Sequence, residues 1–205
     1  MDKETDIEYT LAYRDVKHPR LEFKTGTLLL ILPKTQNPKQ TLQKYRKWIQ
    51  RKQQTINKAL QEAKTKTINQ TRTEKQLKEL VNTLAQKYQK ELDTHINKII
   101  YRKMKTKWAS HSRNNNLTVN TLLKYLPQDL IGYIIYHETT HAIERKHNQN
   151  FWNHINKKHP DYETKEKDLL TYWFIIQKTI NNPVQPSEVL NTNLNKLNAN
   201  RSEQI

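Results

Sequence analysis

The sequence predicts an α+β protein in which a small antiparallel sheet packs beside a buried helix carrying two histidines and a glutamate. Short apolar–polar alternations bounded by turn residues occur at residues 7–32 and again at 96–119, as in β-strands. Apolar residues recur at helical spacing at residues 42–92 and again after Pro127. The helix after Pro127 contains His137-Glu138-Thr139-Thr140-His141, which is an H-E-x-x-H pattern.

The composition excludes several classes of protein. The 205 residues include two glycines and no cysteine, so Gly-rich phosphate loops, disulfides and Cys-ligated zinc are excluded. The mean hydropathy is −1.02. No apolar run is long enough for a membrane span, and the N-terminus lacks the basic-then-apolar build of a signal peptide. We therefore expect a soluble, cytoplasmic protein that does not bind membranes.

The net charge of +16 raises the question of an anionic partner. A strongly cationic surface attracts nucleic acids, nucleotides or acidic polypeptides. Lysines and arginines scattered over exposed helix faces would give the same composition without any partner. The charge alone leaves both interpretations open, and the oligomeric state is open as well.

Residues 1–94 are predicted to form an N-terminal β region followed by a basic helical arm. Three strands are expected to form a small antiparallel sheet or hairpin, at Ile7–Tyr13, Leu21–Phe23 and Leu28–Leu32. Two basic amphipathic helices follow, one from Pro38 and one over about Leu77–Leu92, with a weak helix or linker at Ala63–Thr73 between them.

Residues 95–180 are predicted to form the metal-binding domain, and residues 181–205 a disordered tail. Two short strands are expected to flank the turn Asn114-Asn115-Asn116, in which Asn114 and Asn116 would take left-handed conformations in place of glycine. The remaining expected elements are a strand at Ile96–Tyr101, a helix from Gln128 to about Ile143, a helix at Gln149–Lys158 capped by Asn148, and a helix at Lys165–Ile180.

The two histidines of the pattern have the spacing of metal ligands. Residues four apart lie on the same face of a helix, so His137 and His141 can bind one ion. Glu138 lies beside them, where it can take a proton from a metal-bound water. The sequence therefore predicts Glu138 as the general base of a hydrolase.

His147 is the third predicted ligand, and it sets a condition on the backbone. It lies about 240° around an unbroken helix from His141, on the wrong face. The helix must therefore end between these two histidines, with the next helix starting after Asn148. Three histidines and a water would give the tetrahedral, open arrangement of catalytic Zn²⁺, one ion per chain, although another divalent metal is an alternative. Glu144, Glu163 and Glu166 are alternative third ligands.

Four further residues are candidates for contacting the substrate. Arg102, Lys105 and Lys107 precede the hairpin and could clamp phosphates. His111 lies in the hairpin and could contact substrate if the hairpin borders the cleft. The remaining histidines are expected at the surface or in packing contacts; they are His18, His95, His154 and His159.

Taken together, several motifs resemble the YgjP-like metallopeptidase family, which is related to the SprT-like zincins. They are residues 105–112 (KTKWASHS), 117–120 (LTVN), 126–127 (LP), 133–141 (YIIYHETTH), 147–152 (HNQNFW) and 160–162 (PDY). The resemblance implies a zincin-like α+β fold, His137, His141 and His147 as metal ligands, and Glu138 as catalytic acid/base. Ala109 and His111 depart from the family's usual Trp-Gly-Ser-Cys hairpin, and Thr139 departs from its usual leucine.

Three functions are compatible with these features. A zinc-dependent metallopeptidase is the leading hypothesis, by analogy with zincins. A metal-dependent nucleoside triphosphate hydrolase keeps the metal and uses the cations at residues 102–107 as a phosphate clamp. A basic, nucleic-acid-associated protein with a structural metal site is the third.

Overall fold

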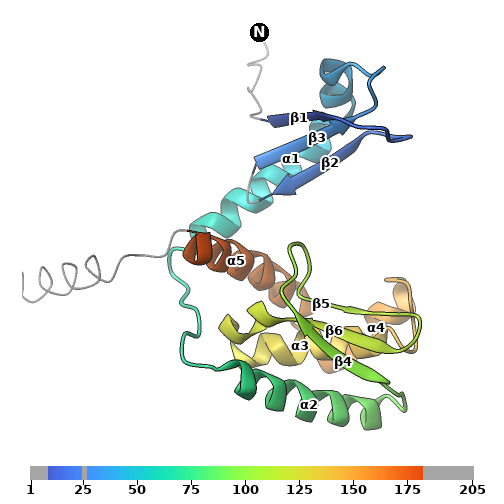
Figure 1. Cartoon of the computed structure of the whole chain (residues 1–205), viewed down its shortest axis with the longest axis vertical. Helices are drawn as coiled ribbons and strands as arrows, with labels where there is room; N and C mark the ends of the chain where they lie inside the picture. Colours follow the sequence, from blue (N-terminus) through green and yellow to red (C-terminus); the bar gives the residue numbers. More distant parts are fainter. Residues whose placement is uncertain (1–8, 25–26, 182–205) are drawn as a thin grey trace, which may run out of the picture.

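The computed structural model describes residues 9–24 and 27–181, and in that part of the chain the fold is mixed α+β, as predicted (Figure 1). The predicted tail, 181–205, lies outside the described residues apart from Asn181. In chain order the elements are β1 (Tyr9–Tyr13), β2 (Arg20–Lys24), β3 (Thr27–Leu32), α1 (Pro38–Glu62), α2 (Glu74–Glu91), β4 (Lys98–Arg102), β5 (Ala109–His111), β6 (Asn116–Asn120), the 3₁₀-helix η1 (Thr121–Tyr125), α3 (Gln128–Thr140), α4 (Gln149–Lys158) and α5 (Tyr162–Asn181). None of the described helices combines the length and the apolar character needed to cross a bilayer.

The N-terminal unit is a three-stranded sheet packed on α1. Leu28, Leu30 and Leu32 of the central strand β3 are almost fully buried, since alternate residues of a strand share one face. Phe23 of β2 packs on Trp48 of α1 with ring centroids 6.1 Å apart. The expected antiparallel sheet is correct only for β2 and β3, because β1 runs parallel to β3.

The segment between α1 and α2 is an ordered linker tied to the C-terminal half. The Asn69 N–H donates to the Tyr125 carbonyl at 2.8 Å, and the Arg72 guanidinium donates to the Leu126 carbonyl at 2.6 Å. Thr73 then caps α2 in a capping box with Gln76. These contacts fix where α2 starts and how it approaches η1.

The second sheet has the strand order β4-β6-β5, with β4 parallel and β5 antiparallel to β6. The prediction of an antiparallel sheet is therefore wrong for β4. The β4–β5 connection crosses the end of the sheet and leaves a gap between these two strands, which β6 fills. Asn120, fully buried at the end of β6, holds this connection through hydrogen bonds to the backbone of Met104 and Lys107.

Replacing Asn120 with alanine should destabilise the fold by about 2–4 kcal/mol, because several buried backbone groups would lose their partner. Besides the connection, its Oδ1 accepts from the Leu122 N–H at 3.1 Å. Urea unfolding of the variant measures the effect. Asn156→Ala, on the exposed face of α4, is the control and should stay within about 0.5 kcal/mol of wild type. Equal stability of both variants would contradict the conclusion that Asn120 holds the β4–β5 connection in place.

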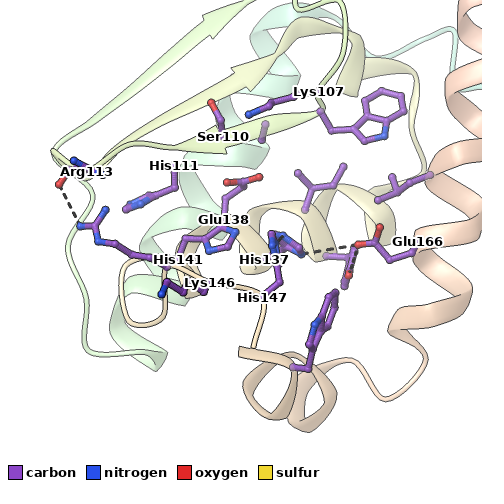
Figure 2. A pocket seen from close by; sticks show the side chains of 17 residues that line it. Lys107, Ser110, His111, Arg113, His137, Glu138, His141, Lys146, His147 and Glu166 are labelled. Atoms are coloured by element: carbon purple, nitrogen blue, oxygen red, sulfur yellow. Dashed lines mark hydrogen bonds and ion pairs between the residues drawn. The ribbon is translucent and has the colours of Figure 1, made fainter. Parts of the chain in front are cut away.

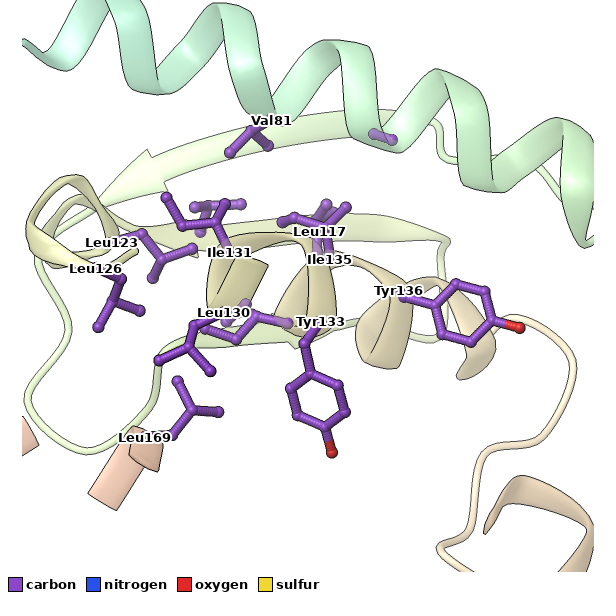
Figure 3. Close-up of a cluster of buried hydrophobic side chains, with 14 of the residues drawn as sticks. Val81, Leu117, Leu123, Leu126, Leu130, Ile131, Tyr133, Ile135, Tyr136 and Leu169 are labelled. Atoms are coloured by element: carbon purple, nitrogen blue, oxygen red, sulfur yellow. The ribbon is translucent and has the colours of Figure 1, made fainter. Parts of the chain in front are cut away.

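The main core joins α2, α3 and the second sheet (Figure 3). Ile131 and Ile135 of α3 lie in one buried cluster with Val81 of α2 and Leu117 of β6. The predicted boundary after residue 94 therefore cuts through a single core. We propose instead that the division lies in the linker at residues 63–73.

Candidate metal centre and its cleft

The predicted break in the metal helix is present. Helix α3 ends at Thr140, three residues earlier than expected, and His141 is its C-cap. The Thr139 and Thr140 hydroxyls donate to the carbonyls four residues earlier, at 2.7 and 2.9 Å, and so satisfy these two buried hydroxyl groups within the helix. After the turn, the Asn148 side chain caps α4 as predicted, accepting from the Phe151 N–H.

The turn brings the three predicted histidines together. The ligand atoms of His137, His141 and His147 all lie within 4.8 Å of one another (Figure 2). The Nε2 atoms of His137 and His147 are 3.0 Å apart. The His141 Nδ1 lies 3.0 Å from the Glu144 carbonyl, and a bond there leaves Nε2 for an ion. Three imidazoles in this arrangement are a donor set that suits zinc.

Two aromatic side chains from the first turn of α4 form a wall behind the histidines. Phe151 is fully buried and stacks on His141 at 4.7 Å, and Trp152 stacks on His147 at 5.7 Å. Their place in the first turn of α4, three and four residues after the capping residue Asn148 and close in sequence to His147, is the signal from which this contact could have been predicted.

Two of the three histidines, His137 and His141, are held in the neutral form that a metal requires. Burial, followed by the nearby His141 and His147, lowers the pKa of His137 to about 3. Burial also lowers the pKa of His141, partly offset by its bond to the Glu144 carbonyl. A neutral imidazole has a lone pair to donate, so proton competition for these ligands is weak near neutral pH.

Glu138 lies between the histidines and strand β5 (Figure 2). Burial raises the pKa of Glu138 to about 7, although the His111 backbone N–H and the charge of Lys107 act in the opposite direction. A carboxyl group with a pKa near the working pH is well suited to accept and return a proton.

The raised pKa of Glu138 predicts a pH-dependent stability difference. An acid whose folded pKa exceeds its unfolded value of 4.5 binds its proton more tightly when folded. Its stabilisation is full below about pH 4.5 and is lost as the pH rises through about 7, in total about 3 kcal/mol. In metal-free protein, the free energy of unfolding of wild type should therefore fall by this amount relative to that of Glu138→Gln as the pH rises from about 4.5 to above about 7. Chemical unfolding at several pH values measures the difference, and a constant difference would contradict the buried carboxyl.

Of the three glutamates that are alternative ligands, Glu166 alone is among the residues lining the cleft, and it lies on the Nδ1 side of the His137 ring. The buried Nδ1 of His137 has no hydrogen-bond partner among the described residues and lies 3.9 Å from Glu166 Oε1. The same oxygen accepts from the Tyr133 hydroxyl at 2.6 Å. The other ring nitrogen of His137, Nε2, faces His147. Glu166 is therefore placed to orient a ligand ring rather than to bind the ion.

Glu166→Gln should weaken metal binding about 10- to 100-fold, since the carboxylate would no longer orient His137 and raise its basicity. A competition titration with a chromophoric chelator measures the dissociation constant directly. Glu163→Gln is the matched control, because this exposed glutamate on the same helix is not among the residues lining the cleft. Equal affinities for both variants would rule out the orienting role.

The histidines and Glu138 line a cleft of about 1000 Å³ between β5, α3, the turn after α3, α4 and α5. Two of the predicted substrate residues, Lys107 and His111, line it, whereas Arg102 and Lys105 do not. Neither ring nitrogen of His111 has a hydrogen-bond partner among the described residues. Sequence reasoning missed Arg113, Arg145 and Lys146, which also line the cleft.

Comparisons with known proteins bear on the family. Residues 57–172 match the sequence model of the YgjP-like metallopeptidase domain. The zymogen of Pyrococcus abyssi abylysin is 23% identical, with a TM-score of 0.38 over 42% of this chain and 87% of its own. The zymogen of Methanocaldococcus jannaschii jannalysin is 30% identical, with a TM-score of 0.38 over 49% and 94%. Both are titled metallopeptidase zymogens. No curated protein matches the sequence.

The family match spans more than half of the chain, beginning within α1, and confirms the resemblance predicted from the motifs. It includes the three clustered histidines, Glu138 and most of the cleft. A metallopeptidase domain implies a divalent metal, and the three imidazoles form a group that can hold one. The chain therefore belongs to the YgjP-like metallopeptidase family.

Proposed function

We propose that this protein is a zinc-dependent peptidase with a zincin-like site, in which His137, His141 and His147 hold the ion and Glu138 is the general base. The observation that carries the proposal is the position of strand β5, whose outer edge faces the cleft beside Glu138. A free strand edge next to a hydrolytic site is suited to binding an extended peptide.

The backbone bonds of β5 distinguish the groups that face β6 from those that face the cleft, where the His111 N–H lies against the Glu138 carboxyl. Trp108 and Ser112 direct their backbone groups to β6, through bonds of 2.8 Å to the Asn120 N–H and 2.9 Å to the Asn116 carbonyl. Alternate residues turn these groups to opposite sides, so Ala109 and His111 turn theirs toward the cleft. A peptide that paired with this edge would lie across the mouth of the metal site.

The chain's own groups would then carry the proton transfers. When bound, zinc supplies a Lewis acid that lowers the pKa of a water and polarises the scissile carbonyl. Glu138 takes a proton from the water as the water oxygen bonds to the scissile carbonyl carbon. The same carboxyl delivers that proton to the departing nitrogen as the carbon–nitrogen bond breaks. The pKa of Glu138, about 7, suits both transfers.

Peptide cleavage tests the proposal. Zinc-loaded protein is incubated with a proteome-derived peptide mixture, and new termini are identified by mass spectrometry, with Glu138→Gln as the control for contaminating proteases. Cleavage by wild type alone supports the proposal. Phosphate release from nucleoside triphosphates, without peptide cleavage, would replace it with phosphoanhydride hydrolysis. Of the predicted phosphate clamp for that reaction, only Lys107 lines the cleft.

Nucleic-acid association is a second candidate function, favoured by the solvent face of α1. Its exposed residues Lys44, Lys47, Arg51 and Lys58 fall within about 60° on a helical wheel, over about 21 Å of axis. None of them takes part in an ion pair between described residues. Because a solvated face usually mixes both signs of charge, this unneutralised row fits the phosphates of a nucleic-acid strand.

Fluorescence polarisation with a labelled single-stranded oligonucleotide tests this second function. Reversing Lys44, Lys47 and Arg51 to glutamate should weaken binding and reduce the slope of log affinity against log salt by about 2. The control reverses three exposed lysines of α2, Lys75, Lys87 and Lys90. Absence of wild-type binding at low salt, or equal effects of both triple variants, would rule out the α1 row as a binding surface.

A further inference from the structure

Most of the cations that line the cleft gather at one end. Arg113 and Lys146 line the end near the β5–β6 turn (Figure 2), and Arg145 joins them there through its bond to the Arg113 carbonyl. Glu166 lines the other end, and a fourth cation, Lys107, lines the cleft just before β5. The histidines and Glu138 lie between the two ends. We call Arg113, Arg145 and Lys146 the cationic end of the cleft.

The cationic end is built from two separate segments that are tied together. Arg113 belongs to the β5–β6 turn, and Arg145 and Lys146 belong to the turn between α3 and α4. The Arg145 guanidinium donates to the Arg113 carbonyl at 3.3 Å, which links the two turns across the end of the cleft. This bond holds the guanidinium at the end of the cleft.

The three cations are available to a ligand. All are exposed, and none is in an ion pair between described residues. The nearest carboxylate along the chain, that of Glu144, accepts from the backbone N–H of Lys146 and is not among the groups lining the cleft. A ligand in the cleft therefore meets cations at this end without a competing carboxylate.

We propose that the cationic end is a subsite for an anionic group of the substrate, such as an aspartate or glutamate carboxylate. This inference rests on the proposed peptidase function and names its substrate class. Arg113 follows β5 in the chain, two residues beyond His111, at the start of the β5–β6 turn. A peptide paired with β5 would therefore place a residue on one side of the scissile bond against the three cations. A phosphate group shares this chemistry and would occupy the same subsite.

The specificity profile from the peptide mixture tests the subsite. Wild-type cleavage sites should be enriched in aspartate or glutamate at a position on one side of the scissile bond. Arg145→Glu/Lys146→Glu should lower kcat/KM for an acidic peptide about 10- to 100-fold, as expected for losing contacts with a charged group. It should leave the matched neutral peptide within about threefold. Lys75→Glu/Lys157→Glu, at two exposed sites outside the cleft, is the control for net charge.

A single-substitution variant and a pair of anionic peptides extend this test. Lys146→Glu alone keeps the link from Arg145 to Arg113 and should still lose part of the acidic preference. Paired peptides with glutamate or phosphoserine at the preferred position show which anion the subsite favours. Cleavage without acidic or phosphorylated enrichment would overturn the subsite and leave the peptidase intact. No cleavage of any peptide would instead count against the proposed function.

Discussion

Replacing Glu138 with glutamine is expected to lower kcat/KM about 10²- to 10⁴-fold while zinc stays bound. Glutamine keeps the size of the side chain but cannot accept the proton of the attacking water. The three clustered ligand groups do not include Glu138, so the metal should remain. Steady-state cleavage of a peptide, with metal content measured on the same sample, tests both halves of the prediction.

Glu163→Gln is the matched control for this experiment, because it makes the same substitution at an exposed site that is not among the residues lining the cleft. It should leave the rate unchanged. A Glu138→Gln variant that retains zinc and cleaves peptides within twofold of wild type would show that another group moves the proton.

Replacing His147 with alanine is expected to weaken metal binding more than replacing the orienting residue Glu166 does. His147 provides one of the three clustered imidazoles, and its Nε2 is 3.0 Å from that of His137. Loss of a direct ligand should exceed the roughly 10- to 100-fold loss expected for an orienting residue such as Glu166. Zinc content after purification, and the dissociation constant from chelator competition, measure the loss.

His95→Ala is the control for His147→Ala, since His95 is exposed and does not belong to the cluster. Circular dichroism checks that the turn between α3 and α4 has not unfolded, because His147 also stacks on Trp152. Wild-type zinc affinity in His147→Ala would show that a carboxylate or water replaces the third imidazole at no cost.

The geometry around the histidines could be predicted well from sequence because it depends on local signals. The spacing of His137 and His141, and the wrong helical phase of His147, together required a break that the structure shows. Asn148 signalled the start of α4 through its capping side chain, and Gln149–Lys158 is the helix that was expected.

Features that depend on distant segments could not be predicted in the same way. Alternation of apolar and polar residues identifies which residues form strands. It does not give the order or direction of the strands in the sheet, so the parallel β4–β6 pair was missed. The left-handed residue of the turn is Asn115, with φ of 51°, rather than the flanking Asn114 or Asn116, since three consecutive asparagines carry the same signal. Leu122, a possible strand residue, lies in η1.

The contacts of Glu166 and Arg145 were missed for the same reason. Glu166 reaches His137 from a different helix, α5, and Arg145 reaches the Arg113 carbonyl from another turn. Neither residue has a spacing that distinguishes it from the many other charged residues of this chain. Only the packing of α5 and of the two turns around the cleft identifies them.

Metal stoichiometry is the most direct test of the central claim, which is that three histidines form a zinc site. Protein purified without chelators is analysed by plasma mass spectrometry, and X-ray absorption at the zinc edge gives the ligands. We predict one ion per chain, bound by three imidazole nitrogens and one oxygen ligand. A chain that carries no metal, and takes up none when zinc is added, would contradict the account.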